Sequence, residues 1–173
     1  MKVTIFISSL QKELQEERRM IKEYIHGDPL LRRFFKVFLF DDLPASDRRP
    51  DDSYLSEVDR SGIYVGLFGN EYGAQDSNGL SPVEREFDRA TAKGIVRLIF
   101  VKGANDKVRH PKMRALIRKA GTQLIRRRFA SIPDLTAALY ASLVEDLERK
   151  GMLRKAPFDA SACPRATIDD ISD

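Results

Sequence analysis

Residues 62–94 read GIYVGLFGNEYGAQDSNGLSPVEREFDRATAKG, and this stretch indicates how the chain folds. Its apolar run Ile63–Phe68 has the length and character of a buried strand. The glycine-bracketed loop Gly69–Gly73 follows, and Ser81 and Glu84 then have the spacing of a capping box that opens a helix. A strand, a glycine-containing loop and a helix N-terminus in this order are typical of anion and nucleotide sites in open α/β sheets.

The helix that follows Ser81 carries two glutamates in different positions. Val83 and Phe87 mark its apolar stripe, and at the helical period Glu86 falls beside that stripe. Glu84 falls away from the stripe and has a structural role as the cap partner. A carboxylate held against an apolar face is partly desolvated, which raises its pKa and suits acid–base or nucleophilic chemistry. Two interpretations of Glu86 stay open: a reactive carboxylate, or a boundary residue paired with an arginine.

Composition restricts the class of protein. The chain has 173 residues, of which 42% are hydrophobic and 32% charged, as in ordinary globular domains. Its apolar runs fall short of the roughly 20 residues that span a bilayer, so no membrane segment is predicted. The single cysteine, Cys163, excludes an internal disulfide, and without a cysteine cluster no thiolate metal site is predicted. A reducing cytoplasm is the expected compartment.

The charge pattern is balanced overall and locally basic. Thirty basic and 26 acidic residues give a net charge of +4, too little to indicate nucleic-acid binding by itself. Basic residues cluster at Arg32–Arg33, within Lys112–Lys119 and at Arg126–Arg128. We interpret them as a solvated or partner-facing surface, with direct nucleic-acid contact as the alternative.

Strand and helix patterns alternate along the chain. Strands are predicted at Val3–Ser8, Phe34–Phe40, Ile63–Phe68, Ile95–Val101 and Thr122–Phe129. Helices are predicted from Ser8–Ser9 to about His26, over Asp52–Arg60, after Ser81, over Pro111–Ala120 and from Ser131 to Lys150. Because hairpin signals are absent, we expect a five-stranded, mainly parallel sheet covered on both faces. This is a three-layer α/β/α sandwich of flavodoxin-like order.

In that fold the carboxyl ends of the first three strands share one edge of the sheet, where such folds bind ligands. The candidate ligand-binding residues at this edge are Ser8, Ser9, Asp41, Asp42, Gly69, Tyr72, Gly73 and Ser81. Residues Ser8 to Gln11 also have the form of a capping box. We therefore expect one serine hydroxyl to cap the first helix and the other to be available to a ligand.

The common catalytic motifs are absent from the sequence, which has no P-loop, G-x-G-x-x-G, H-E-x-x-H or G-x-S-x-G pattern. His26 and His110 are far apart, and His110, directly before Pro111, is interpreted as a loop residue. Neither a metal site nor a serine–histidine triad is predicted. What remains is a carboxylate and several hydroxyls, with Glu86 as the candidate catalytic residue. That set suits chemistry at an anomeric carbon.

Three blocks of sequence resemble the DUF4062 family: Val3–Arg18, Asp59–Gly73 and Ser81–Phe87. That family is similar to Toll/interleukin-1 receptor (TIR) domains and nucleoside 2-deoxyribosyltransferases, so the resemblance implies a flavodoxin-like, TIR-like fold. In those relatives a glutamate four residues before a small residue cleaves an N-glycosidic bond, and Glu86 and Ala90 have that spacing. The resemblance also implies NAD or another nucleotide as ligand or substrate, and assembly into homo-oligomers.

The sequence departs from this pattern in two ways. Gly62 stands where the family more often has an acidic residue, and the chain lacks the tryptophan common near the TIR glutamate. We therefore expect Tyr72 or Phe68 to stack on a nicotinamide or base in place of the tryptophan.

After Gly151 the sequence changes character. Pro157–Ile171 resembles the lead-in to AlbA/Schlafen-type DNA-binding domains, which follow such a module in bacterial proteins labelled as transcriptional regulators. We therefore expect a domain over residues 1–151 and a linker or lead-in over 152–173. The expected partners are C-terminal domains of the same polypeptide and, through them, nucleic acid, in transcriptional regulation or anti-phage defence.

Three functions follow from these observations. The first is a nucleotide-binding signalling or sensor module without catalysis. The second is hydrolysis of the N-glycosidic bond of NAD or a nucleoside by way of Glu86. The third is a nucleic-acid accessory domain that uses Arg126–Arg128 and the neighbouring basic helix.

Overall fold

A computed structural model of the chain describes residues 1–39 and 50–153, and of residues 50–53 the backbone alone. Five strands form one sheet in the order β2-β1-β3-β4-β5, and all four neighbouring pairs are parallel. The strands are β1 (Val3–Ser8), β2 (Phe35–Phe38), β3 (Ile63–Phe68), β4 (Val96–Lys102) and β5 (Arg126–Phe129). This is the flavodoxin-like order, so the predicted fold class is confirmed.

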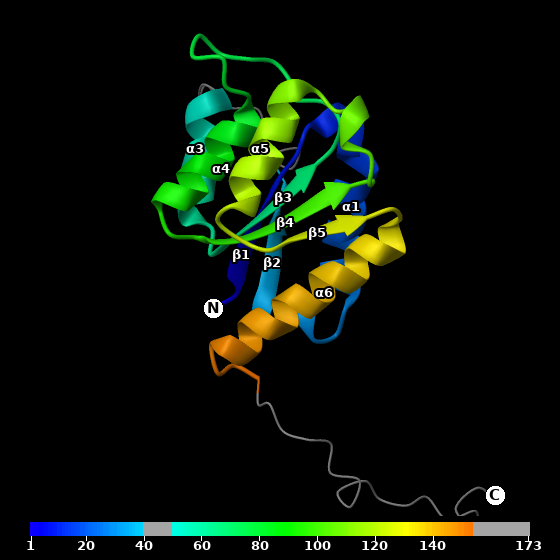
Figure 1. The fold of residues 1–173 in the computed structure, drawn as a ribbon. Coiled ribbons are helices and arrows are strands. Elements are labelled where there is room, and N and C mark those ends of the chain that lie inside the picture. The colour runs from blue at the N-terminus through cyan, green and yellow to red at the C-terminus, as the bar shows by residue number, and fades with distance from the viewer. Residues whose placement is uncertain (40–49, 154–173) are drawn as a thin grey trace, which may run out of the picture.

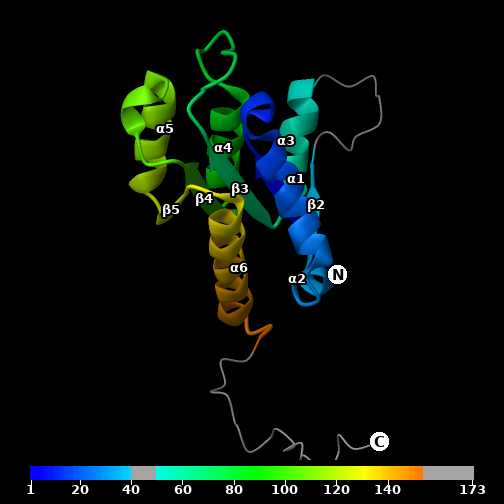
Figure 2. The same ribbon diagram turned by 90° about the vertical axis from the view of Figure 1, so that its right-hand side faces the viewer.

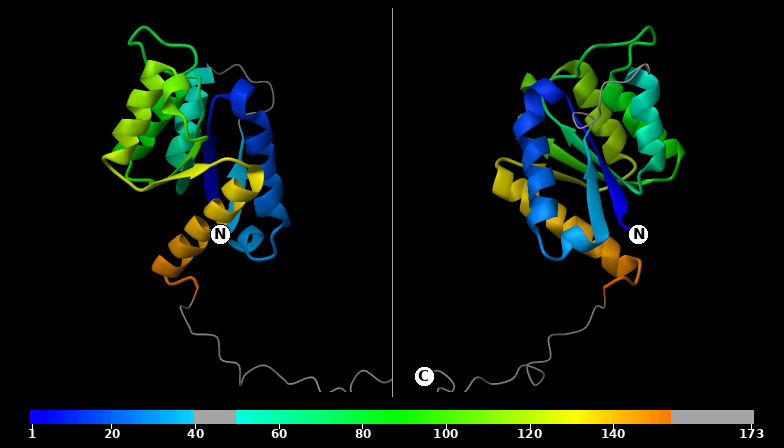
Figure 3. Two further views of the ribbon diagram at one scale, coloured as in Figure 1. Left: turned by 45° about the vertical axis from the view of Figure 1, so that its right-hand side comes forward. Right: turned by 180° about the vertical axis from the view of Figure 1, so that it is seen from behind.

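Helices cover both faces of the sheet (Figure 1). They are α1 (Gln11–Gly27), α2 (Leu31–Phe34), α3 (Pro50–Arg60), α4 (Pro82–Ala92), α5 (Pro111–Gly121) and α6 (Ile132–Arg149), with a 3-10 turn η2 at Asp106–Val108. Figure 2 looks onto α1 and α6 on one face, and Figure 3 shows α3, α4 and α5 on the other. None of the helices in the described ranges is long and apolar enough to cross a membrane.

The two faces of the sheet bury separate apolar cores, because successive strand residues point to opposite sides. Ile5 and Ile7 of β1 pack toward α1 and α6, whereas Phe6 packs toward α3, α4 and α5. The central strand β3 is buried along its whole length, since its neighbours and both helix layers enclose it. The apolar run that organises the sequence is therefore the centre of the fold.

Two predicted strands are shorter in the structure. β2 begins at Phe35 because the residues before it close a single helical turn, α2. β5 begins at Arg126 rather than Thr122, because the backbone N–H groups of residues 122–124 bond to carbonyls in the last turn of α5. The predicted position of β5 at the sheet edge is confirmed.

Candidate functional site

A cavity of about 720 Å³ lies at the carboxyl-terminal edge of the sheet. Its wall comes from the end of β1, the first turns of α1, the loop after β3, the start of α4 and the residue before α5. These elements meet where an open α/β sheet binds its ligands. Four of the predicted site residues line the cavity: Ser9, Tyr72, Gly73 and Glu86. Asp41 and Asp42 lie outside the described residues.

Glu86 is a buried carboxyl group in the wall of this cavity. The residue is 5% exposed, and its Oε2 accepts a hydrogen bond of 2.5 Å from the hydroxyl of Ser8. Burial raises the pKa of Glu86 from 4.5 to about 7, an effect that Ser8 and the charges of Arg18 and Arg85 partly offset. Within the described residues, no ion pair joins Glu86 to an arginine. The carboxyl group is therefore held by a neutral hydroxyl and is poised to titrate near neutral pH.

The predicted capping box at Ser8–Gln11 is wrong. Ser8 is still a strand residue that pairs with Gly66, so α1 begins only after Leu10, which makes no side-chain cap. The Ser8 hydroxyl donates to Glu86 instead, and the Ser9 hydroxyl accepts from Arg18 Nη1 at 3.2 Å. Both serines thus support the charged groups of the cavity wall rather than the helix end.

The capping box at the start of α4 is only half formed. The Ser81 hydroxyl accepts from the backbone N–H of Glu84 at 3.3 Å, which confirms the N-cap. In a full capping box the Glu84 carboxylate would accept from the backbone N–H of Ser81. Here the Tyr72 hydroxyl accepts from that N–H at 3.3 Å and itself donates to the Glu84 carboxylate. Glu84 also accepts from Lys119 at 3.1 Å. Ser81 is fully buried and does not line the cavity.

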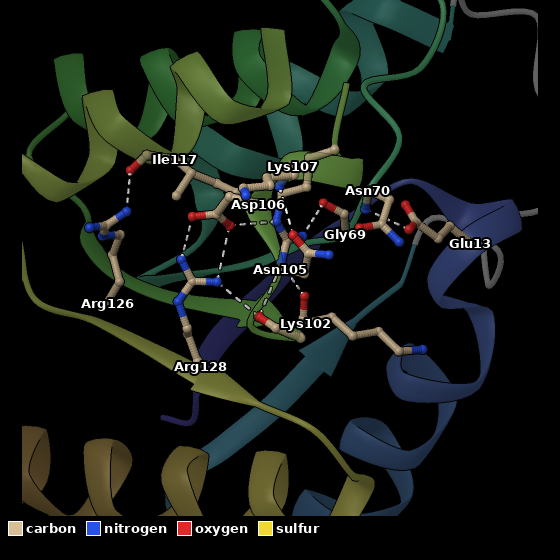
Figure 4. A network of polar contacts seen from close by, with 12 residues as sticks. Glu13, Gly69, Asn70, Lys102, Asn105, Asp106, Lys107, Ile117, Arg126 and Arg128 are labelled. Atoms are coloured by element: carbon tan, nitrogen blue, oxygen red, sulfur yellow. Dashed lines mark hydrogen bonds and ion pairs between the residues drawn. The ribbon is translucent and has the colours of Figure 1, made fainter. Parts of the chain in front are cut away.

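The loop after β3 binds a side chain of the protein itself. The Glu13 carboxylate accepts from the backbone N–H groups of Asn70 at 2.6 Å and Glu71 at 3.1 Å. Figure 4 shows Glu13 facing Gly69 and Asn70. A Cβ atom at residue 69 would overlap with that carboxylate, so glycine admits Glu13 rather than a ligand. Gly73, at φ +88°, has the left-handed backbone that favours glycine and lines the cavity.

The two aromatic residues expected to stack on a base, Tyr72 and Phe68, are buried by other side chains of the protein. Tyr72 is 1% exposed and stacks on the imidazole of His110, with ring centroids 5.6 Å apart and planes inclined by 11°. Phe68 is fully buried and meets Phe87 edge to face in the core. His110, in the loop directly before α5 as predicted, is half-buried and lines the cavity.

The cavity lining also holds charged residues that were not predicted, among them Arg18 and Glu13. Both line the cavity from α1, and Arg18 is 4% exposed. The backbone of α1 is kinked at Leu14 (φ −126°, ψ 29°), between these two residues, so an unbroken helical period would not have placed them together. No group of three or more histidine, cysteine, aspartate or glutamate side chains in the described ranges is arranged to hold a metal ion.

The basic strand β5 is engaged within the protein. Arg126 donates to the carbonyl oxygen of Ile117 at 2.7 Å, and Arg128 donates to Asp106 at 2.7 and 3.1 Å, as Figure 4 shows. Arg127 is exposed. Two of the three guanidinium groups are thus already engaged by acceptors within the protein, which does not favour the nucleic-acid interpretation of this strand.

The fold and the cavity define a flavodoxin-like α/β domain that holds the buried carboxyl group of Glu86 in its cavity wall. The family model described as "Domain of unknown function (DUF4062)" matches residues 4–144, and the chain belongs to this family.

Among solved structures, the chain is similar to the Clostridium botulinum CMP N-glycosidase BcmB. The two share 11% identity and a TM-score of 0.51, over 80% of this chain and 98% of that chain. It is also similar to the TIR domains of the activated Roq1 resistosome that recognises the pathogen effector XopQ. The two share 10% identity and a TM-score of 0.47, over 71% of this chain and 73% of that chain. Oxidised flavodoxin 1 from Bacillus cereus is a third structure to which the chain is similar. The two share 13% identity and a TM-score of 0.44, over 84% of this chain and 98% of that chain. No curated protein matches the chain.

Proposed function

We propose that the cavity binds a nucleotide or nucleoside and that Glu86 acts on its N-glycosidic bond. The observation that carries this proposal is the buried carboxyl group of Glu86 in the cavity wall, held at 2.5 Å by Ser8. The similarity in fold to a CMP N-glycosidase supports the same class of reaction. The spacing of Glu86 and Ala90, which resembles that of TIR-like relatives, supports the same residue.

In the proposed reaction, the bond between the anomeric carbon and the base nitrogen breaks, and its electron pair leaves with the base. The Glu86 carboxylate stabilises the oxocarbenium-like centre or attacks it to form a glycosyl ester. Water then adds its hydroxyl to the anomeric carbon, which breaks the bond to Glu86 wherever the ester has formed and returns the carboxylate, and the proton of the water goes to the departed base or to the solvent. Ser8 keeps one carboxyl oxygen in place, so the other oxygen is available to the sugar.

The ionised form of Glu86 is the reactive one in this scheme. Because burial raises the pKa of Glu86 to about 7, the carboxylate is the minority species below neutral pH and the majority species above it. Base release by the free protein should therefore rise with pH through about 7 and level off.

The test is incubation of the purified chain with NAD and, separately, with CMP, followed by chromatographic detection of free nicotinamide or cytosine. Glu86→Gln keeps the size of the side chain and removes its charge, so it should abolish release. Asp88→Asn is a matched control on the same helix, because Asp88 is partly exposed and pairs with Lys119 away from the cavity lining. Release that Glu86→Gln retains would contradict the proposal.

A non-catalytic sensor is the second candidate, and the raised pKa of Glu86 is what favours it. A protonated carboxyl group can donate a hydrogen bond to a bound nucleotide without cleaving it. The domain would then report nucleotide occupancy to further domains of a transcriptional regulator or defence protein, as the resemblance of its tail implies. For a sensor we expect nucleotide binding that Glu86→Gln preserves, and no base release by the wild-type chain.

A further inference from the structure

His110 has a defined tautomer in the cavity wall. It precedes α5 as its N-cap, and its Nδ1 accepts the backbone N–H of Lys112 at 3.2 Å. A nitrogen that accepts a hydrogen bond carries no proton, so the proton of the neutral ring lies on Nε2. Within the described residues, Nε2 has no hydrogen-bond partner. The ring therefore has one N–H donor that the protein does not use.

The ring is also held in place from several sides. Tyr72 stacks on it, and the Tyr72 hydroxyl is itself bound at the start of α4. The backbone N–H of His110 donates to the carbonyl oxygen of Asn70 at 2.8 Å. The preceding residue, Arg109, is 3% exposed and donates to the carbonyl oxygen of Gly69 at 2.6 Å. A donor on such a fixed support loses little freedom when it binds a ligand.

We propose that His110 is a specificity-determining residue that donates a hydrogen bond from Nε2 to the heterocyclic base of a bound nucleotide or nucleoside. The inference rests on the proposed function, namely that the cavity accepts such a ligand. A neutral N–H group in an aromatic wall matches the carbonyl oxygen or ring nitrogen of a base. The phosphate of a nucleotide is better matched by the cationic side chains of Arg18 and Lys12, which line the cavity from α1.

Two substitutions at His110 test the roles of the two ring nitrogens separately. In His110→Asn, the side-chain oxygen takes the place of Nδ1 and keeps the N-cap, while the Nε2 donor is lost. In His110→Gln, the amide nitrogen takes the place of Nε2 and restores the donor, while the cap is lost. If His110 had a purely structural role as the N-cap, His110→Asn would reduce ligand binding less than His110→Gln does. The proposed role predicts the opposite for ligand binding.

The experiment measures binding of NAD, CMP and ribose 5-phosphate by calorimetry, with Glu86→Gln as the parent so that no ligand is consumed. If the parent binds NAD or CMP, His110→Asn should lower the affinity for that ligand by about tenfold, which is the effect of losing one hydrogen bond. His110→Gln should recover most of that loss. Ribose 5-phosphate, which has no base, should bind equally to all three proteins or to none.

The outcomes distinguish this proposal from the proposed function. If the parent binds NAD or CMP and His110→Asn binds it within twofold of the parent, the role of His110 is overturned while the nucleotide site stands. Equal weakening by His110→Asn and His110→Gln overturns it as well, because the donor then does not decide binding. If the parent binds neither NAD nor CMP, the proposed function fails, and the role of His110 fails with it.

Discussion

At the scale of single residues, the burial of Glu86 makes the stability of the protein depend on pH. Its pKa is 4.5 in an unfolded chain and about 7 in the folded one, so the folded state binds the proton more tightly. The stability that this proton contributes is fully present below pH 4.5 and is lost as pH rises through about 7. At about 1.4 kcal/mol per pKa unit, the full loss amounts to roughly 3 kcal/mol.

Glu86→Gln should therefore stabilise the protein in alkaline solution and have little effect in acid. We expect its gain in unfolding free energy to be roughly 2 kcal/mol larger at pH 8 than at pH 5. Urea unfolding of both proteins at the two pH values measures this difference. A gain that is the same at both pH values would mean that Glu86 does not titrate between them.

Ser8 sets the midpoint of that titration. Its hydrogen bond to Glu86 favours the ionised carboxylate and so lowers the pKa against the effect of burial. Ser8→Ala should move the pKa of Glu86 above 7, which shifts any base release toward higher pH. Ser142→Ala is the control, because the Ser142 hydroxyl donates to the carbonyl oxygen of Ala138 within α6 and contacts neither Glu86 nor Arg18. A wild-type pH profile for Ser8→Ala would show that the hydroxyl does not act on the carboxyl group.

At the scale of elements, α1 is tied to the loop after β3 through Glu13. Gly69→Ala adds a methyl group that would displace the Glu13 carboxylate from the backbone N–H groups of Asn70 and Glu71. We expect a loss of about 1.5–3 kcal/mol in the wild-type chain, the range for hydrogen bonds to a charged group. In a Glu13→Ala background, the same change should cost almost nothing, because the displaced group is already absent. Equal losses in both backgrounds would refute this contact.

At the scale of the whole molecule, one buried arginine joins the carboxyl ends of the central and edge strands. Arg109 donates to backbone oxygens at the ends of β3 and β4, and to Asp106 at 2.8 Å. Asp106 in turn accepts from Arg128 of β5. Because the cavity is built on this edge, the arginine supports the frame of the site as well as the sheet.

Arg109→Met should therefore cost roughly 3 kcal/mol, since it leaves several buried carbonyl oxygens without donors. Arg127→Met is the matched control on an exposed position of β5, where we expect a change within about 0.5 kcal/mol. Chemical denaturation of the two variants makes the comparison. Similar stabilities for both would show that Arg109 does not hold the strands together.

The fold could be predicted from the sequence because its signals are local. Val3–Ser8 and Ile63–Phe68 are strands over the predicted residues, since short apolar runs bounded by polar or glycine residues have few other solutions. Helical periodicity placed Glu86 beside the apolar stripe of its helix, and the structure buries it there.

The details of the site depend on contacts between distant segments, which carry no local signal. Ser8 resembles a helix cap until Glu86, on another helix, is brought against it. Likewise, Gly69 resembles a ligand loop until Glu13 arrives from α1, and His110 resembles a loop residue until Tyr72 stacks on it. The predicted boundary at residue 151, the tail that follows it and the partners it implies stay predictions.

We propose that Glu86 is a buried, titrating carboxyl group of a nucleotide site. The most direct measurement follows the side-chain carboxyl carbon of Glu86 by NMR from pH 4 to 9, alone and with NAD or CMP, using Glu86→Gln to assign the signal. We predict a midpoint near pH 7 in the free protein and a shift of the signal or its midpoint with at least one of the two ligands. A midpoint near 4.5 would show that Glu86 is not desolvated, and a signal that neither ligand moves would show that Glu86 is not part of a site for NAD or CMP.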